Sequence, residues 1–485
     1  MKKKLMMIVP ALVLLTTGVT AEKPLTLGYE YDITREKVPT AATLRRVADI
    51  VSSLGYTQLQ LYFKDNFAYP AHPVIWKDRA HVTPEEMREF DAYCAERGLE
   101  LVPYQSSFGH LEPWFRHAEY LPLAESPDGV HFTRPFKLDR EPMGLCATSS
   151  NAVEFVAGLY DVLLPCFRGR YVNAGCDEVW DLYSEKCRSD YELREKGRGR
   201  VYVDFIRTLD RLARDRGKTL MFWSDIIHRY PDVVPLIPES AIALNWAYEA
   251  DEPYAQTTAE LARAKRRFYV CPGTSSWCSY FGRHDNMKGN VLNAFTNGKK
   301  NGAEGLLLTD WGDQGYPQPW IVSLPALVFT SALVRDGVTI DDAEIARRVD
   351  RVCGCRIGES LIRAANVYLR VPVNGGNGTS LYRFARHPEG ILGKPWFKQA
   401  DFDASVAELR AAQAMRDLTG APAWVREDVE LFDLLVDFVA RRVGGARGSL
   451  SDEFRDRYVR LWKLQNRPEG VEESIRRVFS DCTEH

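Results

Sequence analysis

The sequence lacks the features that would assign it to a nucleic acid or to a structural metal. Its formal net charge is -3 over 485 residues, so no strong overall field would recruit nucleic acid or an anionic lipid surface. Its ten cysteines show none of the CxxC spacing that is typical of zinc sites. We expect most of them to be buried as small apolar side chains, and we predict no disulfide, no metal and no cofactor.

Long apolar runs are also scarce, and the one near the N-terminus is too short to span a membrane. It extends from Leu5 to Val19 behind three lysines and is interrupted by Pro10, whereas a transmembrane helix needs roughly 20 apolar residues. Basic residues, a short apolar core and small residues ending at Ala21 are typical of a secretory signal peptide. We therefore expect residues 1–21 to be removed and the mature chain to be periplasmic or extracellular, without a membrane span.

The rest of the sequence has an ordinary globular composition and a repeated alternation of strand and helix patterns. Hydrophobic residues make up 45% of the chain and charged residues 27%, which is enough to build a sizeable core. Short apolar runs alternate with amphipathic helical stretches, as expected of parallel βα units. The eight strand-like runs are TLGYEYD from Thr26, TQLQLYF from Thr57, LELVPYQ from Leu99, YVNAGCDE from Tyr171, TLMFWSD from Thr219, AIALNWAY from Ala241, RFYVCPG from Arg267 and GLLLTDWGD from Gly305.

Eight βα units in this order predict an α/β fold, a (β/α)₈ TIM barrel. From Asp341 onward the strand pattern ends and helical periodicity continues toward the C-terminus. We therefore divide the chain into a signal peptide (1–21), a catalytic barrel (22–337) and an α-helical C-terminal region (338–485). The segment RLWKLQNRPEG from Arg460 is where we expect the helical region to contact the barrel.

Acidic and aromatic residues gather where the expected strands end. Asp177 and Glu178 end the fourth strand, and the C-terminal ends of the strands form the active-site face of TIM-barrel enzymes. Helix capping accounts for some of these acids, but not for the acids together with the tryptophans. We therefore predict a single cleft with Asp177 and Glu178 at its centre. The other candidates for it are Glu30, Asp65, His110, Trp223, Asp225, Trp246, Tyr248, Trp311 and Asp313.

Paired carboxyl groups beside tryptophans are suited to cleaving a glycosidic bond. One acid protonates the leaving oxygen, and aromatic faces pack against the sugar. Neighbouring strand residues point to opposite sides, so Asp177 and Glu178 reach one sugar only if the chain bends, which Gly175 permits. An ionised Asp177 would then raise the pKa of Glu178 and keep that residue protonated as a general acid.

These segments resemble glycoside hydrolase family 20 in order along the barrel. YVNAGCDEVW looks like the family's Asp-Glu motif, and LQLYFKDNFAYP, SSFGHLEPW, FWSD, NW and WGD resemble its other strand ends. Family members are β-N-acetylhexosaminidases in which the 2-acetamido group of the substrate acts as the nucleophile. The resemblance implies a glycan substrate containing N-acetylhexosamine, with Glu178 as acid and base and Asp177 orienting the acetamido group.

The resemblance also implies roles for the residues around this pair. Trp223, Trp246 and Trp311 would enclose the N-acetyl methyl group and the sugar face. Asp313 would accept hydrogen bonds from outer sugar hydroxyls, and Glu30 lies in the region where a first-strand residue would contact them.

Three further positions have two interpretations each. The donor to the acetamido oxygen is expected to be Tyr248, with Tyr269 as the substitute. His110 either orients the catalytic carboxyl groups or forms hydrogen bonds within its own loop. Asp65 and Asp225 either contact the sugar or support neighbouring loops.

The chain also departs from the family pattern. Asn173 stands where many members carry histidine, and Cys176 replaces a common glycine. The arginine with which many members grip sugar hydroxyls is not evident in the first strand, where Glu30 and Asp32 stand. The barrel begins soon after the signal peptide, without the N-terminal domain usual in the family. We therefore expect a divergent branch with altered hydroxyl recognition.

Two other functions are compatible with the same residues. In the first, Glu178 belongs to a conventional retaining pair that acts on sugars without an acetamido group. Asp225 or Asp313 would then be the nucleophile, about 5 Å from the acid across the anomeric carbon. In the second, the barrel binds carbohydrate without cleaving it, and Asp177 points away from the cleft.

Overall fold

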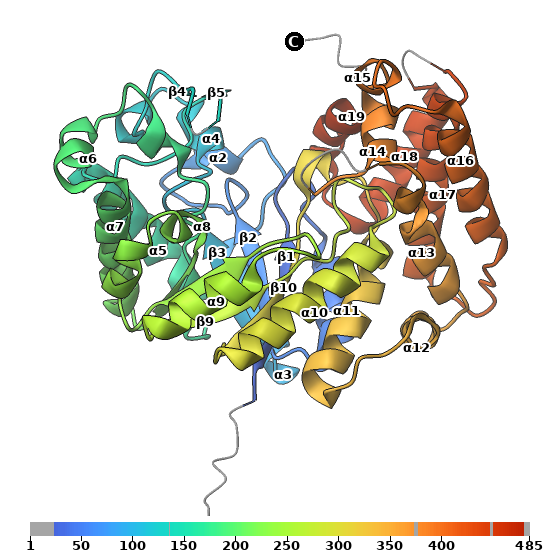
Figure 1. Cartoon of the computed structure of the whole chain (residues 1–485), viewed down its shortest axis with the longest axis horizontal. Coiled ribbons are helices and arrows are strands. Elements are labelled where there is room, and N and C mark those ends of the chain that lie inside the picture. Colours follow the sequence, from blue (N-terminus) through green and yellow to red (C-terminus); the bar gives the residue numbers. More distant parts are fainter. Residues whose placement is uncertain (1–23, 135, 373–376, 447–449, 480–485) are drawn as a thin grey trace, which may run out of the picture.

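A computed structural model describes residues 24–134, 136–372, 377–446 and 450–479 of the chain. Its centre is a closed barrel of parallel strands in the order β1-β10-β9-β8-β7-β6-β3-β2, with β2 paired back to β1 (Figure 1). The predicted (β/α)₈ barrel is therefore confirmed. The strands are β1 (Thr26–Asp32), β2 (Gln58–Phe63), β3 (Glu100–Gln105), β6 (Tyr171–Asn173), β7 (Thr219–Trp223), β8 (Ile242–Trp246), β9 (Arg267–Cys271) and β10 (Gly305–Asp310).

Each of the eight expected strands is present, and the largest difference in length is at the fourth. That run was expected to continue to Glu178, but β6 ends at Asn173. The backbone leaves the extended region directly afterwards, with φ of 71° at Gly175 and 76° at Cys176. Parallel pairing requires negative φ, so the strand cannot continue through these two residues.

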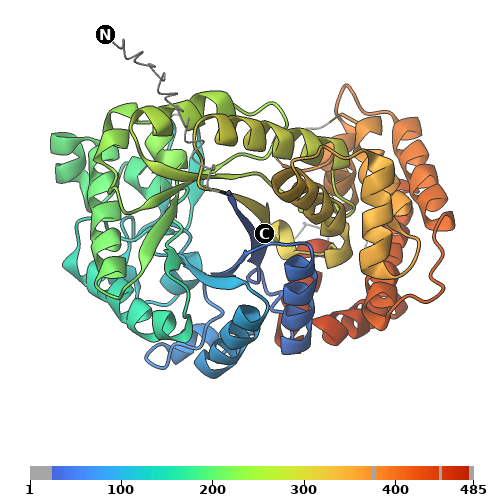
Figure 2. The same ribbon diagram turned by 90° about the horizontal axis from the view of Figure 1, so that it is seen from below.

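Helices surround the barrel, as Figure 2 shows in a view along it. Their amphipathic sequences bury one face against the strands, and local signals fix their ends. Thr83, for example, forms a reciprocal capping box with Glu86, in which each side chain accepts a hydrogen bond from the other's backbone N–H. The principal barrel helices are α1 (Ala41–Ser53), α3 (Pro84–Glu96), α5 (Ser150–Leu163), α7 (Arg198–Arg214), α9 (Tyr254–Arg263), α10 (His284–Lys300) and α11 (Leu324–Ser331).

The connections on the C-terminal side of the strands carry short elements of their own. An antiparallel hairpin pairs β4 with β5 between β3 and β6, and the strand pattern of the sequence did not predict it. Strands of three residues are too short to show a period of two. The short elements are β4 (Val130–Phe132), β5 (Leu138–Arg140), α2 (Pro73–Trp76), α4 (Glu112–Phe115), α6 (Asp190–Lys196) and α8 (Asp225–His228).

The C-terminal region is helical and lies along one side of the barrel (Figures 1 and 2). The contact expected in the segment from Arg460 to Gly470 is present at Arg467. The Arg467 backbone N–H donates to Val38 O over 2.8 Å, and its guanidinium pairs with Glu86 at 2.6 Å. The helices are α12 (Asp342–Cys353), α13 (Gly358–Ala365), α14 (Ser380–Arg386), α15 (Glu389–Leu392), α16 (Gln399–Ala414), α17 (Ala423–Val443), α18 (Asp452–Gln465) and α19 (Val471–Phe479).

The structure bears on only some of the expectations about export and covalent links. The predicted signal peptide, residues 1–21, lies outside the described residues. Within the described ranges, no helix is both long and apolar enough to cross a membrane. The cysteines of these ranges are free, and most of them are buried, as expected of small apolar side chains.

Candidate active site

A cavity of about 260 Å³ lies among the loops that follow the C-terminal ends of the strands. It brings together eight of the residues singled out from the sequence: His110, Asp177, Glu178, Trp223, Trp246, Tyr248, Trp311 and Asp313. Its other lining residues are Arg35, Tyr62, Tyr104, Glu112, Arg140, Gln314 and Asn377. A concave site with convergent carboxyl groups and aromatic walls has the general form of a ligand-binding pocket.

The bend after β6 turns both adjacent acids toward this cavity. Gly175 and Cys176 have positive φ, and Glu178 does too, at 48°. Left-handed backbone at a non-glycine residue costs about 1–2 kcal/mol, so the surrounding structure must hold the bend. Tyr202 Oη donates to Cys176 O over 2.9 Å, and the Glu178 backbone N–H donates to Asp225 Oδ2 over 3.1 Å.

A histidine links the two acids to a third carboxylate behind them. His110 Nε2 lies 3.1 Å from Asp177 Oδ2 and 3.6 Å from Glu178 Oε2. On its other side, His110 Nδ1 is 3.7 Å from Glu112 Oε1, and Lys64 Nζ is 2.8 Å from Glu112 Oε2. Cationic and carboxyl side chains therefore alternate along a line that runs from Lys64 through Glu112 and His110 to the acidic pair. Both contacts considered for His110 are present, one to the acidic pair and one to Glu112 in its own loop.

This arrangement changes the proton affinities of its members. Burial alone would lower the pKa of His110, but Asp177 and Glu112 outweigh it and raise that pKa to about 10. His110 is therefore a cation at neutral pH. Burial raises the pKa of Glu178, the His110 charge opposes the rise, and Asp177 and Asp313 add to it. The direction is the one expected from the sequence, but burial contributes more than Asp177 does.

Indole rings form much of the cavity wall. The ring centroids of Trp223 and Trp311 are 5.6 Å apart, and Trp246 stacks on Tyr248 at 5.0 Å. Tyr104 packs edge-on to Trp223 at 5.8 Å. Apolar ring faces around two carboxyl groups match the needs of a sugar, whose C–H faces are apolar and whose edges are polar.

The two candidate tyrosines, Tyr248 and Tyr269, lie at different places in the barrel. Tyr248 lines the cavity, and its Oη accepts a hydrogen bond of 2.8 Å from Trp311 Nε1. Because an indole N–H can only donate, the Tyr248 hydroxyl hydrogen remains available to another acceptor. Tyr269 pairs with Gly305, the first residue of β10, so it lies toward the opposite end of the barrel.

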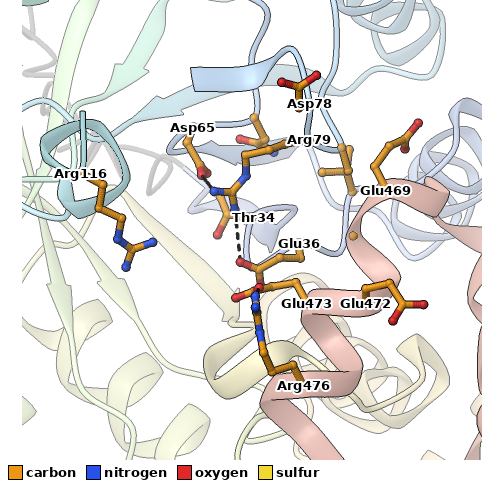
Figure 3. A pocket seen from close by; sticks show the side chains of 14 residues that line it. Thr34, Glu36, Asp65, Asp78, Arg79, Arg116, Glu469, Glu472, Glu473 and Arg476 are labelled. Carbon is orange, nitrogen blue, oxygen red and sulfur yellow. Dashed lines mark hydrogen bonds and ion pairs between the residues drawn. The ribbon is translucent and has the colours of Figure 1, made fainter. Parts of the chain in front are cut away.

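Three predicted residues lie outside the cavity lining. Glu30 is buried inside the barrel and accepts a hydrogen bond from the Asp310 N–H over 3.2 Å. Asp65 faces a second recess, where it pairs with Arg79 at 3.3 Å (Figure 3). Asp225 accepts from the Glu178 backbone, and burial followed by repulsion from the two acids raises its pKa to about 8. All three therefore contact neighbouring loops or strands instead of lining this cavity.

The arginine that was not evident in the first strand lies three residues beyond it. Arg35 lines the cavity, its Nη2 is 3.0 Å from Asp313 Oδ1, and its Nε is 3.2 Å from Asp32 Oδ2. The first strand itself, β1, contains no arginine, in agreement with the sequence. Arg35 was missed because it stands in a turn after β1, where strand periodicity carries no signal.

Two other lining residues come from segments that the strand pattern does not reach. Arg140 belongs to the β4–β5 hairpin, and Asn377 belongs to the C-terminal region. The Asn377 backbone N–H donates to Glu249 Oε1 over 3.3 Å. The helical region thus contributes directly to the rim of the cavity.

Among the described residues, one group outside the cavity has a geometry that could hold a metal ion. It consists of His284, Asp285 and Asp342, on α10 and α12. Lys288 Nζ lies 2.5 Å from Asp342 Oδ1, and His284 Nε2 is 3.0 Å from the same oxygen. The lysine already balances this carboxylate, and we assign no metal there.

Comparisons with known proteins agree with the geometry. Residues 57–293 match the glycosyl hydrolase family 20 catalytic domain. Hexosaminidase D of Homo sapiens is 21% identical over 338 residues, which cover 65% of this chain and 66% of that protein. The β-hexosaminidase of Akkermansia muciniphila is 25% identical over 236 residues, or 42% of this chain and 46% of that protein. The chain thus spans less than two thirds of the length of these curated relatives.

A solved structure shares the fold over nearly the whole chain. The chitobiase of Flavobacterium johnsoniae superposes with a TM-score of 0.55 at 16% identity, covering 92% of this chain and 77% of that one. The match of the catalytic domain spans β2 to β9 and includes Asp177 and Glu178. Residues 57–293, within the (β/α)₈ barrel, therefore match the glycosyl hydrolase family 20 catalytic domain, and the chain is similar to β-N-acetylhexosaminidases.

Proposed function

We propose that the chain hydrolyses β-linked N-acetylhexosaminides by a retaining mechanism in which the substrate's acetamido group is the nucleophile. The observation that carries the proposal is the placement of Asp177 and Glu178 side by side in the cavity, both within reach of the His110 cation. The raised pKa of Glu178 suits that residue to the role of general acid, and the hydrogen bond to His110 fixes the orientation of Asp177.

Glu178 is the general acid in the first step. Burial and the charge of Asp177 raise its pKa, which favours the protonated form that can transfer a proton to the glycosidic oxygen. The acetamido carbonyl oxygen attacks the anomeric carbon as the bond to the leaving oxygen breaks. The aglycone departs as an alcohol, and the sugar becomes an oxazolinium ion.

Asp177 orients the acetamido group for this attack. One of its oxygens bonds His110, while Oδ1 is buried without a hydrogen-bond partner among the described residues. A buried acceptor left unpaired costs about 1–3 kcal/mol, and the N–H of the acetamido group would satisfy it. The carboxylate would also stabilise the positive charge that develops on that nitrogen.

Tyr248 and three tryptophans would contact the carbonyl oxygen and the methyl group of the acetamido substituent. The free hydroxyl hydrogen of Tyr248 would donate to the acetamido oxygen, while Trp311 fixes the hydroxyl by its own hydrogen bond. Trp223, Trp246 and Trp311 would surround the methyl group and the sugar face.

In the second step, water opens the oxazolinium ion. Glu178 is now a carboxylate and takes a proton from the attacking water. The new bond forms on the face from which the leaving group departed, so the β configuration is retained and the acetamido group is restored.

The two carboxylates considered as alternative nucleophiles are both engaged elsewhere. Asp225 lies outside the cavity lining and accepts from the Glu178 backbone. Asp313 is in the cavity but pairs with Arg35 at 3.0 Å. An ion-paired carboxylate is a weaker nucleophile than a free one, which favours substrate assistance.

The test is an assay of chromogenic β-N-acetylglucosaminide, β-N-acetylgalactosaminide and plain β-glucoside on wild type, Glu178→Gln and Asp177→Asn. We expect a strong preference for the acetamido sugars and, for each variant, a loss of roughly 10²–10⁴ in kcat. Equal turnover of the plain glucoside would favour a carboxylate nucleophile. Sugar binding without any turnover would favour the binding barrel.

We also propose that the protein is exported. The proposal rests on the basic and apolar pattern of residues 1–21. N-terminal sequencing of the mature protein from a bacterial host should find the new terminus directly after Ala21. An uncleaved chain retained with the cytosol would contradict it.

A further inference from the structure

The cavity's ion pair between Arg35 and Asp313 is formed by two loops with unusual backbone. Arg35 and Glu36 follow β1 and have φ of 54° and 70°. Two successive non-glycine residues in the left-handed region cost about 1–3 kcal/mol each. Arg35 therefore keeps its direction into the cavity only if neighbouring structure holds this turn.

The loop that carries Asp313 is bent in the same way. The three residues after it, Gln314, Gly315 and Tyr316, have φ of 64°, 95° and 47°. Gly315 is required for space as well as for its φ, because a Cβ there would lie 3.0 Å from Cβ of Arg477 on α19. The loop therefore packs directly against α19, the last described helix of the chain.

Helix α19 contacts both loops at once. Ser474 Oγ donates to Gly315 O over 3.1 Å, and Arg477 Nη2 lies 3.3 Å from Glu36 Oε1. Arg386 of α14 joins the two contacts, because it donates to Gln314 Oε1 over 3.2 Å and to Arg477 O over 2.6 Å. A helix more than 430 residues along the chain from β1 thus supports both halves of the Arg35–Asp313 pair.

The recess beside these contacts is held together by its own charges. Figure 3 shows Glu36 between Arg79 and the helix that carries Glu473. Arg79 pairs with Glu36 and with Asp65, each at 3.3 Å. The side chain of Glu36 is only 7% exposed, and burial raises its pKa while Arg477 and Arg79 oppose the rise. Arg477 and Arg79 therefore offset part of the cost of burying this carboxyl group next to Arg35.

We propose that α19 is a positioning element of the sugar site, in which Arg477 and Ser474 hold the loops that present Arg35 and Asp313 to substrate hydroxyls. Neither residue lines the cavity, so each acts through the ion pair and not on the reacting atoms. The inference rests on the proposed function only in requiring that the cavity binds a sugar.

The positioning role of α19 predicts that its loss changes KM but not kcat. Hydroxyl contacts far from the anomeric carbon are made in the ground state and the transition state alike, so weakening them raises KM and leaves kcat nearly unchanged. In contrast, a loss of the Asp177–Glu178 machinery lowers kcat.

The experiment measures kcat and KM for Arg477→Ala, Arg35→Ala and the double variant on a glycoside that the wild type turns over. For Arg477→Ala we expect KM to rise roughly tenfold, the change produced by a loss of about 1.4 kcal/mol of binding free energy, with kcat within about twofold. The double variant should show little more than the effect of Arg35→Ala, because both changes act on one unit. Arg477→Lys should restore part of the loss.

Arg476→Ala is the matched control. Arg476 is the neighbour of Arg477 on α19, is 71% exposed and pairs with Glu473, so its replacement should leave KM at the wild-type value. If Arg477→Ala does not fold, Ser474→Ala removes the bond to Gly315 O, together with a contact of 2.8 Å to Tyr458 Oη, and carries the same expectation. Tyr458→Phe removes the second contact alone and is its control. Unfolding in urea, followed by circular dichroism, verifies the fold of each variant.

The outcomes separate the inference from the proposed function. A wild-type KM in folded Arg477→Ala, or an effect that adds in full to that of Arg35→Ala, overturns the positioning role. Turnover of plain glucosides together with a raised KM in Arg477→Ala would overturn substrate assistance and leave the positioning role standing.

Discussion

His110 donates a hydrogen bond of 3.1 Å to Asp177, and its pKa of about 10 makes it a cation at neutral pH. In an unfolded chain a histidine titrates near 6.5. Folding therefore raises the proton affinity of this ring, and the stability of the protein becomes linked to its protonation.

The first prediction follows from that linkage. Because the folded pKa of His110 is raised, its stabilising contribution is fully present below about pH 6.5 and is lost as the pH rises from there toward 10. The loss should amount to a few kcal/mol. Urea unfolding at a series of pH values should show this decline in wild type and a flatter profile in His110→Gln. An equally steep decline in the variant would contradict the assignment.

A second prediction concerns the pH dependence of activity. The acid form of Glu178 is required, so kcat/KM should fall as the pH rises through its raised pKa. Removing the charge of Asp313 takes away one cause of that rise, so Asp313→Asn should move the alkaline limb to lower pH. A pH series of kcat/KM measures the shift, and a limb that stays in place would show that Asp313 does not act on Glu178.

A third prediction compares two buried tyrosines. Tyr248→Phe removes the hydroxyl proposed to donate to the acetamido oxygen, and loss of such a donor costs about 10²–10³ in kcat. Tyr269→Phe makes the same chemical change at the other end of the barrel and should leave kcat unchanged. Steady-state kinetics of both variants on an N-acetylglucosaminide decide the matter, and equal losses would remove Tyr248 from the mechanism.

A fourth prediction concerns Asp225 beneath the bend. Burial and the two neighbouring acids raise its pKa to about 8, so ionising it costs stability as the pH rises from about 4 to 8. Asp225→Asn should therefore unfold at higher urea concentration than wild type at pH 8, and the difference should shrink at pH 5. A variant that is less stable than wild type at pH 8 would mean that the carboxylate itself is needed.

The barrel could be predicted from the sequence because strands and helices differ in hydrophobic period. Runs such as GLLLTDWGD from Gly305 are apolar over several residues and end in polar ones, and this repeats at each strand. The bend after β6 could be anticipated only as a possibility permitted by Gly175. The positive φ of Cys176 and Glu178 depends on tertiary contacts that a sequence pattern does not contain.

The two acids at the centre of the cavity could be predicted from the sequence, but several of the other lining residues could not. Asp177 and Glu178 were identified by position on the barrel and by their chemistry. Arg35 and Asn377, in contrast, stand in turns without periodicity, and Asn377 is about 200 residues from the acidic pair. Choosing between Tyr248 and Tyr269 required the register of β9 against β10, which only the structure supplies.

The reach of the helical region into the cavity bears on how such proteins diversify. Asn377 stands on the rim, and α19 supports the loops opposite. If the cavity binds a sugar as proposed, a recombination that exchanged everything after residue 337 would change its rim and the support of its loops, even though every barrel strand was inherited intact. The proposal therefore predicts that sugar preference depends on both segments of the gene.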